Sequence, residues 1–290
     1  MNEWPNQIFH NEGGKVEIER ITSADLHPKM PEIGGSTIVL QRNAKDDRRK
    51  DSPDMGALEV GAAEQVRVNA KEFFNKIFGG LNEEERKMID VMVIASDSTL
   101  STPDGIKNKH QRAVETAGQV MTGLRESMSE FFIADGQLLN NSAAQNGGAI
   151  EVSELRDLMI LEESPEFTQF LIDKYGTGVE FWDAYESDSE RETRVEMGAE
   201  GPDGIADRVN YALSLQAQIA DEYHKANPDR RLIIWAVSHY DSISPFIKRH
   251  IAGIDMKKYL PVDQGAGISI GIDKRGKASC EIQGKELSLN

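Results

Sequence analysis

The sequence predicts an α/β fold, with a mostly parallel sheet, helices on both faces and an antiparallel β-hairpin at the C-terminus. Three short apolar runs, each suited to a buried strand, alternate along the chain with longer segments of helical periodicity. From residue 267 onward the apolar residues alternate instead with period two around Lys274-Arg275-Gly276, which is typical of an antiparallel hairpin on the sheet edge.

Each strand and helix has its own local signal. The first strand is "TIVL" (37–40), and a helix follows over 60–78, where Gly79-Gly80 stops it. Asn82 and Glu85 have the spacing of a capping box just before the second strand, 91–95. Helical periodicity returns over 109–132 and 203–229, and "RLIIWAVSHYDS" supplies the third strand.

Composition shifts divide the chain into an extension, a main domain and an insertion. Residues 1–35 are polar and rich in turn residues, so we interpret them as an N-terminal extension laid on the surface of a domain over 36–290. Residues 135–205 are rich in Asn, Gly, Ser and Glu, and Ser164-Pro165 marks a helix start within them. We expect this region to form a cap inserted over the site.

Charge and cysteine content restrict the class of partner and the compartment. The chain has 49 acidic and 33 basic residues and a net charge of -16, which disfavours binding to polymeric nucleic acid or to an anionic membrane. It has one cysteine, Cys280, so no internal disulfide can form and a reducing compartment fits best. Neither a membrane span nor a signal peptide is recognisable, and we expect a cytoplasmic protein; homodimerisation is left open.

Polar residues follow each of the three predicted strands. Arg42 and Asn43 come after the first, Arg112 begins the helix after the second, and His239 comes after the third. Ligands of open α/β sheets bind at the carboxyl ends of the strands, so these side chains are expected to converge. Two guanidinium groups and an imidazole suit a phosphate dianion, and neither a metal nor a cofactor motif is present.

The segments around these residues resemble the histidine phosphatase superfamily, the fold family of phosphoglycerate mutase. Arg42-Asn43 in "TIVLQRNAKD" is similar to its Arg-His-Gly/Ala signature, and "ALEVGAAEQV" to its Leu-Thr-x-x-Gly-x-x-Gln segment. "SDSTLSTPDGIKNKHQRAVETA" resembles the segment of the second arginine, and "AVSHYDS" that of the second histidine. The matches keep the family's order over about 36–134 and 206–290, and they imply a phosphoglycerate mutase-like three-layer sandwich.

The resemblance implies that position 43 carries the nucleophile, which in the family is a histidine that becomes phosphorylated. Here it is Asn43, whose amide has no lone pair for attack on phosphorus, so we expect this chain to be inactive or nearly so. An engineered replacement and a natural pseudoenzyme both explain it. We favour the engineered one, because Arg42, Arg112 and His239 all keep their family identities.

The proton donor and the substrate contacts are less well marked. Asp241 has the spacing of the acid that some relatives place just beyond the second histidine, while Asp135 and Glu151 are alternatives. Lys45 and Arg48 follow the first motif and are candidate contacts for an acidic or phosphorylated substrate, although a solvated turn explains them as well.

These observations predict a phosphomonoester hydrolase that works through a phosphohistidine, with this chain blocked at position 43. A phosphomutase needs the same pocket but must shield its phosphohistidine from water, and the polar cap is a poor seal. A non-catalytic receptor for a phosphorylated ligand is the alternative from another class. The sequence does not identify the substrate.

Overall fold

The computed structural model describes residues 9–11, 13–47, 57–98, 110–143, 147–156, 164–254 and 259–289. Within these ranges one seven-stranded sheet has the order β3-β2-β4-β1-β5-β6-β7. The strands are β1 Ser36–Arg42, β2 Ile89–Ser96, β3 Ile150–Val152, β4 Arg231–Ser238, β5 Gly267–Ile272, β6 Ala278–Ile282 and β7 Lys285–Leu289. The strands from β3 to β1 in this order are parallel, and β5 to β7 are antiparallel, which confirms the predicted mostly parallel sheet with a C-terminal hairpin.

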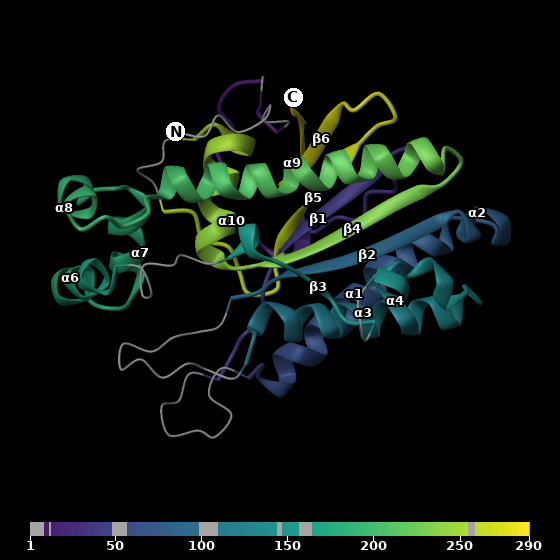
Figure 1. Ribbon diagram of the computed structural model, residues 1–290, viewed down its shortest axis with the longest axis horizontal. Coiled ribbons are helices and arrows are strands. Elements are labelled where there is room, and N and C mark those ends of the chain that lie inside the picture. Colours follow the sequence, from purple (N-terminus) through teal and green to yellow (C-terminus); the bar gives the residue numbers. More distant parts are fainter. Residues whose placement is uncertain are drawn as a thin grey trace.

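Helices cover both faces of the sheet, as Figure 1 shows for α9 on one side and for α1 and α3 on the other. The main helices are α1 Val60–Gly79, α3 Arg112–Glu130, α9 Pro202–Ala226 and α10 Tyr240–Phe246, and a π-helix, Ile247–Ala252, extends α10. Successive strand residues point to opposite faces, so Ile38 and Leu40 pack toward α9 and α10 whereas Val39 packs toward α1 and α3. Two hydrophobic cores therefore form, one on each face.

The predicted strands and helices all form, and the sheet is larger than the apolar runs indicated. Asn82 and Glu85 make the expected capping box at the start of the short helix α2, Glu83–Lys87. The strands β3 and β7 were not predicted, because each is short, and β3 has no buried residue while β7 has two. β3 pairs with the last residues of β2 and is preceded by η2 Asp135–Gln137 and α4 Asn140–Ala143 and followed by η3 Ser153–Leu155.

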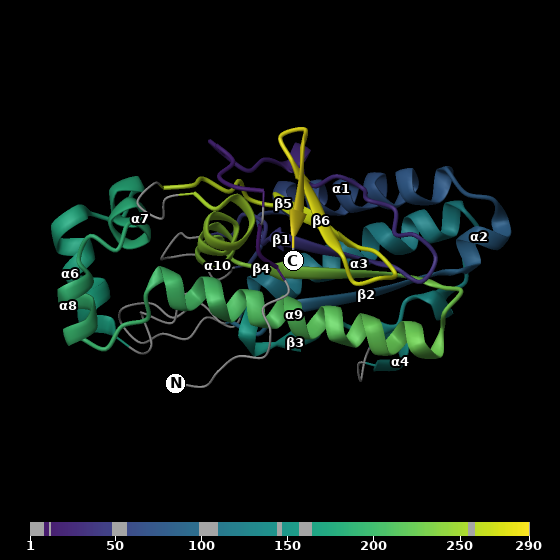
Figure 2. The ribbon, with the colours of Figure 1, turned by 90° about the horizontal axis from the view of Figure 1, so that it is seen from above.

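Three helices gather beyond the end of the sheet at which α9 begins, as both ribbon views show (Figures 1 and 2). They are α6 Pro165–Tyr175, α7 Val179–Glu186 and α8 Arg191–Glu196, and we call them the helical lobe. Pro165 is the first residue of α6, as its spacing after Ser164 predicted. The lobe contacts α10 and its π-helical extension through the buried side chain of Glu186, the last residue of α7.

The described part of the N-terminal extension packs more deeply than its polar composition indicated. Phe9 and Ile21 are fully buried in the core on the α9 face. The backbone amide of Asn11 donates to the carbonyl of His250, and that of Ile21 donates to Pro261, so the extension is fixed along the π-helix and the segment after it. None of the helices within the described ranges combines the length and apolar content needed to cross a bilayer.

Candidate active site

The predicted site residues meet at the carboxyl ends of β1, β2 and β4. Arg42, the last residue of β1, is in register with Ser238, the last residue of β4. The backbone amide of Asn43 donates a 2.8 Å hydrogen bond to the Ser238 carbonyl, which places Asn43 beside His239. Parallel neighbours thus bring residues separated by nearly two hundred positions to one edge, as the sequence predicted.

The contact between Arg112 and His239 determines which nitrogen of the neutral imidazole carries the hydrogen. Nη2 of Arg112 lies 3.5 Å from Nδ1 of His239, and Nε2 of His239 lies 3.2 Å from Oγ of Ser96. Because a guanidinium can only donate, Nδ1 is the acceptor, and the hydrogen of a neutral ring is on Nε2. Nε2–H then donates to Ser96, whose hydroxyl lies 2.8 Å from that of Ser98.

The surroundings of His239 keep its ring uncharged. Burial, and then the positive charges of Arg112 and Arg42, lower the pKa of the imidazole to about 3, against the raising effect of the Asp241 and Asp46 carboxylates. The two guanidinium groups and the two carboxylates therefore act on one ring. An anion bound between them would raise the pKa of the imidazole and so favour its charged form.

Arg42 is held by contacts on two sides of its guanidinium. Nη1 donates to the backbone carbonyl of Val262, and the guanidinium carbon lies 5.1 Å from the centre of the Tyr240 ring, within the range of a cation–π contact. Tyr240 follows His239 directly in the sequence. The start of α10 therefore supplies contacts to both Arg42 and the pocket.

Asn43 is buried and its side chain has a backbone partner. Its Nδ2 donates a 2.8 Å hydrogen bond to the carbonyl of Ala44. The amide of Ala44 donates to Oγ1 of Thr116, and that hydroxyl donates to the Arg112 carbonyl at 2.7 Å. The loop after β1 is thus connected by hydrogen bonds to the first turn of α3, which carries Arg112.

A buried carboxylate that no sequence pattern marked, that of Asp46, also lies beside Arg112 and His239. Oδ1 of Asp46 lies 3.6 Å from Nη1 of Arg112, and both side chains are less than one tenth exposed. An ion pair removed from solvent is screened less than a surface pair. Asp46 therefore offsets part of the positive charge that Arg112 contributes to the pocket.

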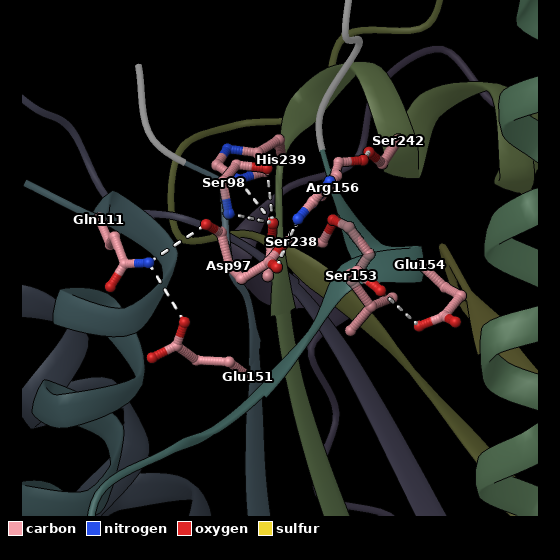
Figure 3. Close-up of polar contacts among 12 residues, drawn as sticks. Asp97, Ser98, Gln111, Glu151, Ser153, Glu154, Arg156, Ser238, His239 and Ser242 are labelled. Atoms are coloured by element: carbon pink, nitrogen blue, oxygen red, sulfur yellow. Dashed lines mark hydrogen bonds and ion pairs between the residues drawn. The ribbon is translucent and has the colours of Figure 1, made fainter. Parts of the chain in front are cut away.

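The candidate proton donors fall at different places. Asp241 is in the first turn of α10, is mostly buried and acts electrostatically on His239. Glu151 is exposed on β3 and accepts from Gln111 at 3.2 Å, at the rim of the same edge (Figure 3). Asp135 lies in η2, whose Gln137 donates to the Ile89 carbonyl at the start of β2, so it belongs to the opposite edge and is too distant to act.

The two basic substrate-binding candidates are not both described. Lys45 is half exposed and its Nζ lies 2.9 Å from Oε1 of Glu59, also half exposed. This is the geometry of a solvated surface pair, and no pocket group lies among its described partners. Arg48 lies outside the described residues.

A further arginine lies at this edge, as Figure 3 shows. Arg156 follows η3 and makes two hydrogen bonds to Asp97, of 2.6 and 2.8 Å, just beyond β2. The pair lowers the pKa of the Asp97 carboxyl, chiefly through the hydrogen bond from Arg156, so Asp97 is not a proton donor at neutral pH. No periodic pattern marks Arg156 in the sequence, because it lies within the polar insertion.

The described ranges contain no group of three or more His, Cys, Asp or Glu side chains arranged to hold a metal ion. The groups that converge instead are two arginines, a neutral histidine, a buried asparagine and two carboxylates. Such a set can bind a small anion through its arginines, and its histidine and carboxylates can take up or release a proton.

The chain is similar in fold to solved structures over most of its length. The phosphoglycerate mutase from Bacillus anthracis str. Sterne is 15% identical, with a TM-score of 0.48, and the match covers 91% of this chain and 96% of that one. Bacillus stearothermophilus YhfR is 14% identical, with a TM-score of 0.48 and coverages of 86% and 97%. A mycobacterial glucosyl-3-phosphoglycerate phosphatase is 11% identical, with a TM-score of 0.43 and coverages of 85% and 97%.

Likenesses at these identities and scores carry no information about the activity of this chain. No protein-family model and no curated protein sequence matches it.

Proposed function

We propose that this chain has the site of a phosphomonoester hydrolase that works through a phosphohistidine, and that Asn43 blocks turnover in this form. The observation that carries the proposal is the contact of the Arg112 guanidinium with the neutral His239 imidazole, at the edge where Arg42 and Asn43 also lie. The two guanidinium groups donate charge-assisted hydrogen bonds, which suit a tetrahedral dianion.

The phosphoryl group of the substrate binds between Arg42 and Arg112. Each guanidinium offers a planar set of N–H donors that matches two phosphate oxygens, which a lysine cannot do. His239 gains a proton as the dianion arrives, because the negative charge favours the imidazolium, and it then donates to a phosphate oxygen. The same donors stabilise the charge of the transition state.

With a histidine at position 43 the reaction has two steps. Its Nε2 lone pair attacks phosphorus and the bond from phosphorus to the leaving oxygen breaks, while Asp241, which must be protonated at this step, gives that oxygen its proton. Water then attacks the phosphohistidine, returns a proton to Asp241 and releases inorganic phosphate. With Asn43 the first bond cannot form, so the chain binds and does not hydrolyse.

The second candidate function is a non-catalytic receptor for a phosphorylated ligand, with Asn43 as the native residue. The observation that favours it is the fit of Asn43, which is buried with its amide hydrogen-bonded and a backbone φ in the ordinary range. We continue to favour an engineered replacement, because the three other pocket groups are those that the hydrolytic reaction requires.

Isothermal titration calorimetry with inorganic phosphate and with orthovanadate tests the proposal on the chain as it stands. We expect one site per chain for each anion, and competition between the two. If neither anion binds at concentrations up to tens of millimolar, the site does not bind phosphate, and both proposed functions are refuted.

A further inference from the structure

A fully buried ion pair lies behind the pocket, on the side of the helical lobe. Glu186 and Lys248 both have no exposed side-chain surface, and Nζ of Lys248 lies 2.8 Å from Oε2 of Glu186. The carboxylate also accepts from three other donors, namely the hydroxyls of Tyr240 and Ser244 and the backbone amide of Leu260. A buried charge that is this well satisfied fixes the groups around it.

The groups come from two helices that face each other. Glu186 is the last residue of α7 in the helical lobe. Tyr240, Ser244 and Lys248 follow one another at intervals of four residues along α10 and its π-helical extension, so they share one helix face. The lobe is therefore attached to the element that begins directly after His239.

Tyr240 connects this network to the phosphate pocket. Its hydroxyl donates to Oε1 of Glu186, and burial together with the Glu186 carboxylate raises its pKa, so the hydroxyl stays protonated as a donor. The centre of its ring lies 5.1 Å from the guanidinium carbon of Arg42 and 5.2 Å from the centre of the Trp182 ring, which packs edge-on. Trp182 and Glu186 are four residues apart on α7, so one face of α7 holds Tyr240 by both its ring and its hydroxyl.

We propose that Tyr240 is a positioning residue for Arg42, and that the Glu186–Lys248 pair fixes Tyr240 so that the helical lobe sets the affinity of the phosphoryl pocket. This inference depends on the proposed function, because it concerns the orientation of one of the two phosphate-binding guanidinium groups. Bidentate binding requires the guanidinium plane to face the anion. The Val262 carbonyl holds one nitrogen of Arg42, and the Tyr240 ring limits rotation of the plane about that contact.

Substitutions of Tyr240 test the inference in the chain as it exists, with phosphate titrated by calorimetry. Tyr240→Leu removes the ring beside Arg42 and is expected to weaken phosphate binding about 5- to 10-fold. Tyr240→Phe keeps the ring but frees it from Glu186, and about a 2- to 3-fold loss is expected. The matched control is Tyr175→Phe, which removes another tyrosine–glutamate hydrogen bond, to Glu190 in the same lobe, and should leave phosphate affinity unchanged.

Double variants separate a positioning role from a general loss of structure. If Tyr240 acts through Arg42, adding Tyr240→Leu to Arg42→Ala lowers phosphate affinity little further. Adding it to Arg112→Ala lowers phosphate affinity by the full factor seen in the single variant. Equal effects of Tyr240→Leu in both backgrounds overturn the inference. If Tyr240→Leu does not fold, the same comparison is made with Tyr240→Phe, in which Glu186 keeps its other three donors.

These measurements distinguish failure of the proposed function from failure of this inference alone. Failure of the unaltered chain to bind phosphate refutes the proposed function and this inference with it. Phosphate binding that weakens in Arg42→Ala but is unchanged in both Tyr240 variants refutes this inference alone.

Discussion

The side-chain amide of Asn43 donates its hydrogen bond to the carbonyl of the next residue, Ala44, at 2.8 Å. Nδ2 of asparagine and Nδ1 of histidine are both bonded to Cγ, so a histidine with the same χ1 can place an N–H on the same carbonyl. A neutral imidazole that donates from Nδ1 keeps the lone pair of Nε2. The backbone around position 43 is therefore already suited to orient a nucleophilic histidine.

Asn43→His is expected to create phosphatase activity. Removal of a catalytic nucleophile costs on the order of 10⁴- to 10⁶-fold in turnover, so its introduction beside an intact pocket gives a gain of comparable size. The measurement is hydrolysis of an aryl phosphate, with acid quenching to trap phosphohistidine at position 43. Asn43→Gln, which lengthens the amide without adding a nucleophile, is the control. A histidine variant that binds phosphate but is neither phosphorylated nor active would favour the receptor.

Arg112→Ala should weaken phosphate binding far more than Lys45→Ala. Arg112 is buried beside His239, whereas Lys45 is half exposed and paired with Glu59. A charge-assisted hydrogen bond inside a pocket is worth about 1.5–3 kcal/mol, or roughly 10- to 100-fold in affinity, while a solvated surface charge contributes less than about 1 kcal/mol. Calorimetric titration of both variants decides it, and equal losses would contradict a role for Arg112 in the pocket.

Asp46→Asn is expected to tighten phosphate binding. The Asp46 carboxylate lies 3.6 Å from Arg112, so it opposes the approach of a dianion to that guanidinium. Asparagine keeps the shape of the side chain and removes its charge. At the effective dielectric constant of protein sites, phosphate affinity is expected to rise about 3- to 10-fold. A gain that disappears in the Arg112→Ala background would assign the effect to this pair. Unchanged or weaker binding in the single variant would show that Asp46 does not face the bound anion.

The sequence was sufficient to predict the strands that carry the site. Apolar runs such as 37–40 have few alternatives to a buried strand, and the carboxyl ends of parallel strands share an edge whatever the loops between them do. For that reason the meeting of Arg42, Asn43 and His239 could be predicted from the strands alone. The place of Arg112 needed the predicted start of the helix after the second strand as well.

Other parts of the site depend on contacts that no local pattern encodes. Glu186 and Lys248 are 62 residues apart, and each taken alone would be predicted on the surface. Their burial follows from the docking of the helical lobe on α10. Arg156 likewise gains its role only because β3 joins the sheet beside β2 and brings it to Asp97.

Stability should fall in mild acid in a manner that depends on His239. Its pKa in the folded protein is lowered to about 3, chiefly by burial and then by Arg112. Between pH 6.5 and 3 the unfolded chain therefore binds a proton at this residue that the folded chain does not, and linkage makes folding less favourable as the pH falls through this window. Above about pH 6.5 neither state binds the proton and the penalty is absent.

His239→Gln removes the group that takes up this proton in the unfolded chain, so the free energy of unfolding should depend less on pH. Over the fall from pH 6.5 to 4.5 the unaltered chain is expected to lose about 2 kcal/mol more of its free energy of unfolding than the variant does. Urea unfolding at a series of pH values measures the difference, and only the change with pH is compared, because the substitution also alters packing. His27→Gln, in the N-terminal extension and outside the site, is the control for loss of a histidine. Saturating phosphate should shrink the difference, since the bound anion favours the charged imidazole. Parallel profiles for the unaltered chain and His239→Gln, with or without phosphate, would show that His239 is not held neutral in the empty pocket.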